Sequence, residues 1–360
     1  MAKLCLFCGS SGQLTREHVF GQWVSKIGLD LSPVKHMAGP LNGLGRSMGT
    51  QPPYRQTVKV CSNCNNGWMS RLEMVAQRVL TPLILGEAGV IEVDDQPAIA
   101  MWIQKTALAG MLLSSQEDRD SGYGFPPSEY RALYNHRNRM LPLEASRFWI
   151  GRYCGDEGFS AIRVTPLAVR IQGIPEPKMP QAFIFTIVLG NLVMQGLRFV
   201  AEKLEIDMMS APNMRQIWPC REAVSISLEG SCDRDSFLCF ADGKKLQSTI
   251  TGVKLSPWSP AVNLPQSKIV NGMVELPLMC GKHVAYYPLA LLQDALYGRF
   301  YVFATMCECS VAYLIKLERD GAHCRAAGDP QEIAKIYEEE LGEEVMIGDH
   351  GGSFFCKYLP

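Results

Sequence analysis

The chain has 360 residues, 47% of them hydrophobic, and a formal net charge of -1 at pH 7. This length suits two or three domains with ordinary cores, as in a globular protein. The most apolar stretch, residues 182–200, is broken by Gly190, Asn191 and Arg198. We therefore expect two strands around a turn there and no membrane span. With no secretory signal before the first cysteine, we expect a cytoplasmic location.

The near-neutral net charge hides an asymmetry along the chain. Residues 1–80 carry nine Lys or Arg against three Asp or Glu, a difference of +6, so the remaining residues sum to -7. A basic segment on an acidic protein fits a polyanionic partner. Composition alone supports equally the interpretation that these cations form a solvated loop surface.

The first elements in chain order are a cysteine-tied loop, a strand and a helix, with a Gly- and Pro-rich excursion over residues 31–53. Alternation predicts a strand over residues 56–60. After it, apolar residues recur at helical spacing and predict a helix. These apolar residues are Met69, Leu72, Val75, Ala76 and Val79.

Further along the chain, residues 98–113 predict a buried helix and residues 127–138 a second one. Short apolar runs from Phe148 onward predict an antiparallel sheet. In the last part we expect strands at 301–304 and 311–315 and a helix over 329–341. The fold class is therefore α+β.

Three domains are predicted. The first covers residues 1–85, the second is an α+β domain over 86–255, and the third is an α+β unit over 256–360, either separate from the second or continuous with it. The second domain should consist of helices packed on an antiparallel sheet.

Thirteen cysteines, an odd number, are mostly scattered singly and do not form a disulfide framework. Four of them form two pairs with two-residue spacing, Cys5-x-x-Cys8 and Cys61-x-x-Cys64. Such pairs predict a tetrahedral structural zinc site, which supplies on the order of 10 kcal/mol, more than closure of the loop between the pairs costs. Cys307-Glu308-Cys309 is a much weaker metal candidate.

Between the pairs stands Glu17-His18, and Asn65 and Asn66 follow the second pair at once. Carboxylate and amide oxygens are ligands for a hard cation such as Mg²⁺. A neutral His18 imidazole beside such an ion can take a proton from water. This set predicts metal-assisted hydrolysis, whereas a lone His is usually structural.

The combination of Cys5-x-x-Cys8, Glu17-His18 and Cys61-x-x-Cys64-Asn65 resembles the zinc-containing HNH endonucleases, over about 75 residues. The resemblance implies a zinc-stabilised ββα-metal module. It further implies Glu17 and Asn65 as ligands of a catalytic Mg²⁺ or Mn²⁺, and His18 as general base.

Two departures from the family pattern concern residues that the chemistry needs. The span from His18 to Asn65 is longer than in compact modules, which implies an insertion around residues 31–53. Gln56 stands near the place of the family's Asn that orients the His. Asn66 competes with Asn65 as ligand, and Gly67 allows a sharp backbone turn at the helix start, although Asn66-Gly67 is equally a simple turn.

Around this centre, Arg16, Arg55 and Lys59 are candidates for phosphate contacts. Trp23 and Trp68 are candidates for base stacking, although at helical spacing a Trp is more often a core residue.

We expect an HNH-type endonuclease acting on DNA, with a defence or restriction role by analogy. The alternative is a non-catalytic zinc-scaffolded module that binds nucleic acid or protein. We expect no membrane partner, while residues 86–360 are available for a regulatory or oligomerisation partner.

Overall fold

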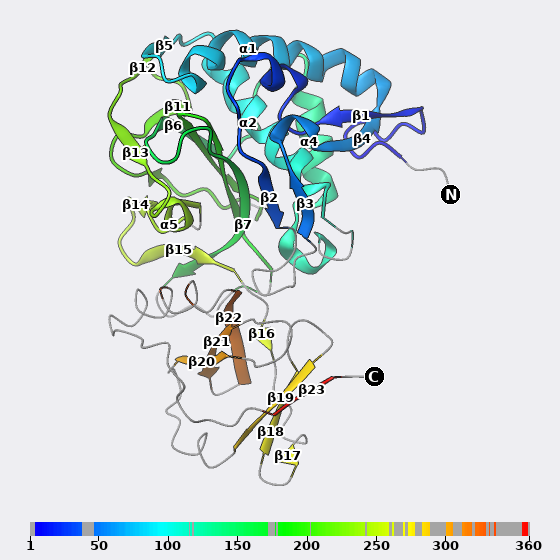
Figure 1. Ribbon diagram of the computed structural model, residues 1–360, viewed down its shortest axis with the longest axis vertical. Helices are drawn as coiled ribbons and strands as arrows, with labels where there is room; N and C mark the ends of the chain where they lie inside the picture. The colour runs from blue at the N-terminus through cyan, green and yellow to red at the C-terminus, as the bar shows by residue number, and fades with distance from the viewer. Residues whose placement is uncertain are drawn as a thin grey trace. The chain divides into compact units, whose positions relative to one another are not determined.

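The computed structural model describes residues 4–37 and 47–258, with short gaps at 115, 117–118, 172–176, 178, 202 and 242. Beyond residue 258 it describes the strands given below, together with Gln331 and Lys335. The chain is a mixed α and β protein with antiparallel sheets (Figure 1). It divides into two compact units, one of Met1–Ala38 with Ser47–Pro257 and one of Gly39–Arg46 with Trp258–Pro360. The predicted boundaries near residues 85 and 255 stay predictions.

The amino-terminal segment is organised around one antiparallel strand pair. β1 (Leu14–His18) pairs with β4 (Thr57–Cys61), with Arg16 opposite Lys59. Between them lie a short helix (Gln22–Lys26), β2 (Val34–Met37), β3 (Ser47–Gln51) and a helical turn (Pro53–Arg55). β2 and β3 pair with each other, inside the excursion for which the sequence predicted no strand.

The second cysteine pair leads into a kinked helical turn (Cys64–Met69) and then α1 (Ser70–Ile84). Gly67 at the kink has φ -95° and ψ -107°, outside helical geometry. The sharp turn at Gly67 and the helix after it are as the sequence predicted. Leu72, Ala76 and Val79 of α1 are buried, as the helical spacing indicates.

A seven-stranded sheet forms the centre of the first unit. Its order is β11-β6-β9-β8-β7-β15, with β13 paired in parallel to β6 and the other neighbours antiparallel. The strands are β6 (Ser146–Tyr153), β7 (Ser160–Ile171), β8 (Ala182–Leu189), β9 (Leu192–Phe199), β11 (Arg215–Trp218), β13 (Gly230–Cys232) and β15 (Val253–Pro257). β8 and β9 meet at Gly190 and Asn191, the predicted turn.

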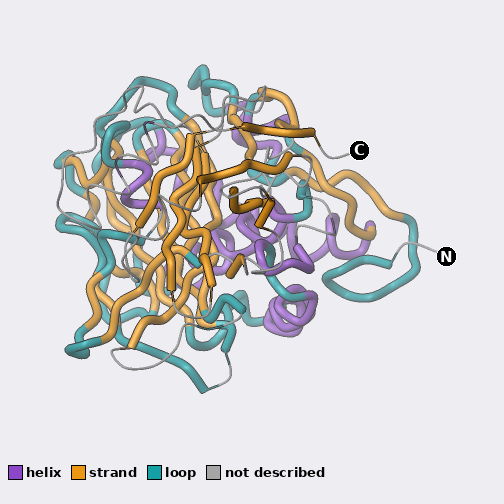
Figure 2. Tube along the Cα trace, turned by 90° about the horizontal axis from the view of Figure 1, so that it is seen from below, coloured by secondary structure: helices purple, strands orange, loops and turns teal. Residues whose placement is uncertain are grey.

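Both faces of this sheet are covered at its centre, where β8 and β9 are almost entirely buried. Along β8, Phe183 and Phe185 belong to one core and Ala182 and Ile184 to the other, as the two-residue period of a strand requires. Helices α2 (Gln96–Met111) and α4 (Pro127–His136) pack with α1 in the first core, and α5 (Phe237–Ala241) packs in the second. Figures 1 and 2 show these helices beside the strands.

Helix α2 is the buried helix that the sequence predicted. All of its residues except Pro97 are buried. Its core also contains residues of the amino-terminal segment, including Phe7, Trp68 and Leu72. The cysteine-bearing segment and the helices on the sheet therefore share one core.

The remaining described strands are short or belong to the second unit. In the first unit β5 (Gly89–Ile91) pairs with β12 (Val224–Ile226), and β10 (Met208–Met209) with β14 (Gln247–Ser248). The second unit has two four-stranded sheets, β16-β22-β21-β20 and β17-β18-β19-β23. Their strands are β16 (Ala261–Val262), β17 (Ile269–Val270), β18 (Met273–Pro277), β19 (His283–Pro288), β20 (Phe300–Ala304), β21 (Ala312–Glu318), β22 (Gly321–Gly328) and β23 (Phe355–Tyr358).

The strands predicted at 301–304 and 311–315 correspond to β20 and β21. The helix predicted over 329–341 and the Cys307-Glu308-Cys309 candidate lie outside the described residues, apart from Gln331 and Lys335. Among the described residues, no helix combines the length and apolarity needed to span a bilayer.

Candidate metal centre and the adjoining pocket

The sulfurs of Cys5, Cys8, Cys61 and Cys64 all lie within 4.8 Å of one another. Cys8 Sγ is 3.3 Å from Cys61 Sγ, and Cys5 Sγ is 4.0 Å from Cys64 Sγ. A tetrahedral zinc ion with Zn–S bonds of about 2.3 Å separates its sulfurs by about 3.8 Å. The four-cysteine cluster can therefore hold a zinc ion, as the paired spacing predicted.

The loop that carries the first pair is folded tightly around its own backbone. The amide of Gly9 donates to the Cys5 carbonyl, and the amide of Cys5 donates to the Ser10 carbonyl. Phe7, between the two cysteines, packs its ring against Trp68 and Tyr130, with ring centroids 5.8 and 5.3 Å apart. The metal loop is thus anchored in the core by its own central residue.

The cluster favours thiolate at two of its positions. The hydrogen bond between the Cys5 and Cys64 sulfurs lowers the pKa of Cys5 to about 4 and raises that of Cys64. Burial raises the pKa of Cys8, but hydrogen bonds with Ser10, Cys61 and Cys64 together outweigh it and the net shift is downward. Thiolate is the form that binds a metal.

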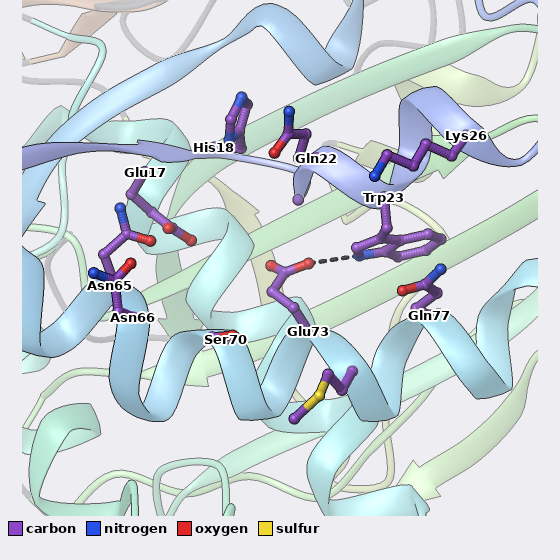
Figure 3. Close-up of a pocket in the computed structure, with 12 residues that line it drawn as sticks. Glu17, His18, Gln22, Trp23, Lys26, Asn65, Asn66, Ser70, Glu73 and Gln77 are labelled. Atoms are coloured by element: carbon purple, nitrogen blue, oxygen red, sulfur yellow. Dashed lines mark hydrogen bonds between the residues drawn. The ribbon is translucent and has the colours of Figure 1, made fainter.

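Beside the cluster lies a pocket of about 320 Å³ (Figure 3). Residues from β1, the Gln22–Lys26 helix, the kinked turn and α1 line it. They are Glu17, His18, Gly21, Gln22, Trp23, Lys26, Asn65, Asn66, Ser70, Glu73, Met74 and Gln77. The structure therefore brings Glu17, His18, Asn65 and Asn66 to one cavity, although Asn65 comes 47 positions after His18 in the sequence.

Asn65 ties the kinked turn to β1. Its amide nitrogen donates to the Thr15 hydroxyl and to the Arg16 carbonyl, each at 3.0 Å. These two acceptors assign the nitrogen to that side of the amide. The amide oxygen is left as the group that Asn65 can offer to a cation.

Glu17 is buried and ion-paired to Lys105, which the sequence analysis did not identify as a site residue. Lys105 Nζ lies 2.8 Å from Glu17 Oε1 and 2.6 Å from Glu73 Oε1, and the Lys105 side chain is fully buried. Burial alone lowers the pKa of a lysine, but the two carboxylates outweigh it and raise the pKa of Lys105. Lys105 is therefore a buried ammonium ion between two carboxylates.

Glu73 is fixed by three donors. Besides Lys105, the indole nitrogens of Trp102 and Trp23 donate to its two carboxylate oxygens. Gly21 has φ +76°, and a Cβ there would lie 1.9 Å from Glu73 Oε2, so only glycine admits this close approach. The Glu73 carboxylate is thereby held at the wall of the pocket.

The two tryptophans proposed for base stacking are both core residues. Trp23 and Trp68 are buried, and the Trp23 indole nitrogen donates a hydrogen bond to Glu73. The structure therefore supports the core interpretation of both residues.

His18 and Glu17 leave β1 in different directions. In Figure 3 the Glu17 carboxylate lies on the side of β1 that faces α1, near Asn65, and the His18 ring extends from the other side, near Gln22. This follows from the alternation of side chains along a strand. His18 stands opposite Thr57, at the end of the strand pair.

Gln56 is buried just before β4 and does not line the pocket. Its backbone carbonyl accepts from the Val19 amide, at 2.9 Å. Among the described residues its side-chain oxygen has no hydrogen-bond partner. An orienting role toward His18 stays a prediction.

The candidate phosphate contacts are exposed. Arg16 and Lys59 face each other across the β1–β4 ladder, and Arg55 closes the Pro53–Arg55 turn. Like charges directly opposite each other are unfavourable in a sheet unless an anion lies between them.

The sequence did contain a signal for Lys105. It is the only charged residue in the apolar run over residues 98–113, and a charge inside a buried helix requires a partner.

No protein-family model, curated protein or solved structure matches the chain. The assignment of function therefore rests on the geometry of the site.

Proposed function

We propose that the chain is a zinc-scaffolded endonuclease of the HNH type that hydrolyses phosphodiester bonds of DNA. The observation that carries this proposal is the pocket, which gathers Glu17, His18 and Asn65 next to the four-cysteine cluster. The sequence of β1, β4, kinked turn and α1 supports it, because a ββα module has the same order of elements.

Glu17 and Asn65 are the residues that would hold the catalytic cation. Each offers an oxygen at the pocket, and Mg²⁺ or Mn²⁺ takes oxygen ligands while keeping several waters. A bound ion of this kind polarises a phosphate and stabilises the leaving oxygen.

His18 acts as general base in this proposal. Its imidazole accepts a proton from a water molecule as the water oxygen bonds to phosphorus and the bond from phosphorus to the leaving oxygen breaks. Arg16 and Lys59 lie opposite each other on the exposed face of the β1–β4 pair. They contact DNA backbone phosphates and position the DNA strand without reading its base sequence.

One observation favours the alternative, a non-catalytic zinc-scaffolded module that binds nucleic acid or protein. Glu17 is ion-paired to Lys105 and buried, as a purely structural carboxylate would be. In that case the exposed Arg16 and Lys59 still bind a polyanion, but no bond is cut. For the nuclease we infer, by analogy, a cytoplasmic restriction or defence effector, with residues 86–360 available for a regulatory or oligomerisation partner.

The two candidates are separated by a cleavage assay. Purified protein is incubated with supercoiled plasmid and with single-stranded DNA in Mg²⁺ or Mn²⁺, beside His18→Ala and the control His136→Ala. His136 lies at the end of α4, outside the pocket. We expect cutting by the wild type and the control, and a loss of at least about 100-fold in His18→Ala with zinc retained. DNA binding without cutting in either metal excludes the nuclease.

A further inference from the structure

Lys105 occupies an unusual place for a lysine. It projects from the buried helix α2, its side chain is fully excluded from solvent, and its ammonium touches the pocket wall through Glu17 and Glu73. Burying an ammonium ion costs several kcal/mol unless charged partners compensate it. Such an arrangement adds little net stability compared with an apolar side chain of the same size. A purely structural role is therefore a weak explanation for it.

The two carboxylates around Lys105 are not equivalent. Glu73 accepts hydrogen bonds from Lys105, Trp102 and Trp23, which occupy both of its oxygens. Glu17 is paired to Lys105, with Oε1 lying 2.8 Å from Lys105 Nζ, and within the described part of the chain no hydrogen bond to its Oε2 is found. Its side chain keeps 7% of its surface open, and it lines the pocket.

Lys105, Glu17 and Glu73 together carry a net charge of one negative unit, from two carboxylates and one ammonium ion. The contact between Lys105 Nζ and Glu17 Oε1, at 2.8 Å, sets the orientation of the Glu17 carboxylate.

We propose that Lys105 is a positioning residue of the pocket, which holds Glu17 by Oε1 so that Oε2 is presented to a divalent cation. Glu73, with Trp23 and Trp102, is the anchor that fixes the ammonium ion. Lys105 also donates toward the His18 carbonyl, at 3.5 Å. One buried side chain thus contacts both residues of the Glu17-His18 pair. This inference rests on the proposed function.

The test separates positioning from charge compensation with two variants of the full chain. Lys105→Met leaves the two carboxylates uncompensated and is expected to lower stability as well as function. The double variant Lys105→Met with Glu73→Gln removes one charge of each sign, so that Glu17 is the only titratable side chain left of the three. A matched control removes another buried pair in the same way, Arg198→Met with Glu129→Gln. Those side chains pair at 2.7 Å, and neither lines the pocket.

Each protein is loaded with zinc, checked for folding by circular dichroism, and titrated with Mn²⁺ by electron paramagnetic resonance of the free ion. DNA affinity and plasmid cleavage are measured alongside. We expect the folded Lys105→Met/Glu73→Gln protein to bind Mn²⁺ about 10- to 100-fold more weakly and to cut correspondingly slower, with unchanged zinc content and DNA affinity. The control pair should leave both Mn²⁺ affinity and cleavage unchanged.

Two results overturn the inference in distinguishable ways. Wild-type Mn²⁺ affinity and cleavage in the double variant would show that Lys105 only compensates charge, and the nuclease proposal would stand. A wild-type protein that binds no Mn²⁺ beyond its zinc and cuts no DNA removes the proposed function and this inference together.

Discussion

At the scale of single residues, buried charged side chains distinguish the core of this protein from an ordinary apolar core. Lys105 is matched by two carboxylates, whereas Arg152 is buried among backbone carbonyls. Its guanidinium donates to the carbonyls of Leu83, Glu87 and Ser227 at 3.0, 2.7 and 3.2 Å. The burial lowers the pKa of Arg152. Leu83 belongs to the last turn of α1, where a cation is favourable.

Replacing Arg152 with Met should therefore destabilise the protein. Carbonyls left without a donor in a buried place each cost about 1–3 kcal/mol, partly offset by the released charge, so we expect a loss of about 3 kcal/mol. Urea unfolding followed by circular dichroism measures it. The control is Arg78→Met, because Arg78 is mostly exposed in its pair with Asp95, and such pairs contribute about 1 kcal/mol or less. Equal losses in the two variants would contradict this account of Arg152.

A second residue-scale prediction concerns the basic strand pair. The variant Arg16→Ser with Lys59→Ser should bind DNA more weakly, and the slope of log affinity against log salt should decrease by about 2. Fluorescence anisotropy with labelled duplexes at several salt concentrations measures both. Arg139→Ser removes an exposed arginine just beyond α4 and serves as control. An unchanged slope in the double variant would exclude these two side chains as phosphate contacts.

Some of these residues could be inferred from the sequence and others could not. The cysteine spacing and the Glu17-His18 and Asn65 motifs depend on local patterns, and they indicated which residues would lie beside the pocket. The partner of Glu17 depends on which helix packs against β1, and that choice is made by tertiary packing. The lone charge at Lys105 signalled that a partner exists, without saying which one.

At the scale of elements, the sheet is packed closely enough to require a glycine. Gly196 of β9 stands opposite Phe148 of β6 and Phe185 of β8. A Cβ at this position would lie 2.0 Å from the Phe185 ring and 2.8 Å from the Phe148 ring. The two rings pack across the glycine, with their centroids 5.7 Å apart.

Gly196→Ala should thus overpack the first core and cost about 2 kcal/mol, within the usual range for inserting a methyl group into a filled site. Thermal and urea unfolding measure the change. Gly12→Ala, whose nearest neighbour would be the Ser10 hydroxyl at 3.6 Å, should leave stability nearly unchanged. A neutral Gly196→Ala would mean that the two rings move apart without loss.

Helices and strands with strong periodicity were predictable at this scale. α1 followed from apolar spacing, α2 from an apolar run with a single charge, and β8 with β9 from a turn inside an apolar stretch. The strands β2 and β3 were not predicted, because Gly and Pro in that region indicate loops and the pairing is with each other rather than with a larger sheet. The parallel pairing of β13 with β6 is likewise a non-local contact without a local pattern.

At the scale of the whole molecule, the cysteine cluster closes a loop of more than fifty residues between its two pairs. Metal binding should therefore contribute directly to the folding free energy. We expect one zinc per chain by mass spectrometry, and a clear fall in melting temperature after treatment with a strong chelator.

The metal prediction has a matched pair of cysteine variants. Cys8→Ser should lose zinc and melt at a lower temperature, whereas Cys154→Ser, which changes an exposed cysteine outside the cluster, should do neither. Zinc retained at full stoichiometry by Cys8→Ser would contradict the four-sulfur site.

Phe7 makes the metal loop part of the first core of the unit. Its ring packs against Tyr130 of α4 as well as Trp68. The segment that carries the cysteines is therefore not an independent module. Grafted onto another scaffold without α2 and α4, it would keep its ligands and lose the surface on which they are seated. Transplants of this site should therefore take those two helices along with the cysteines.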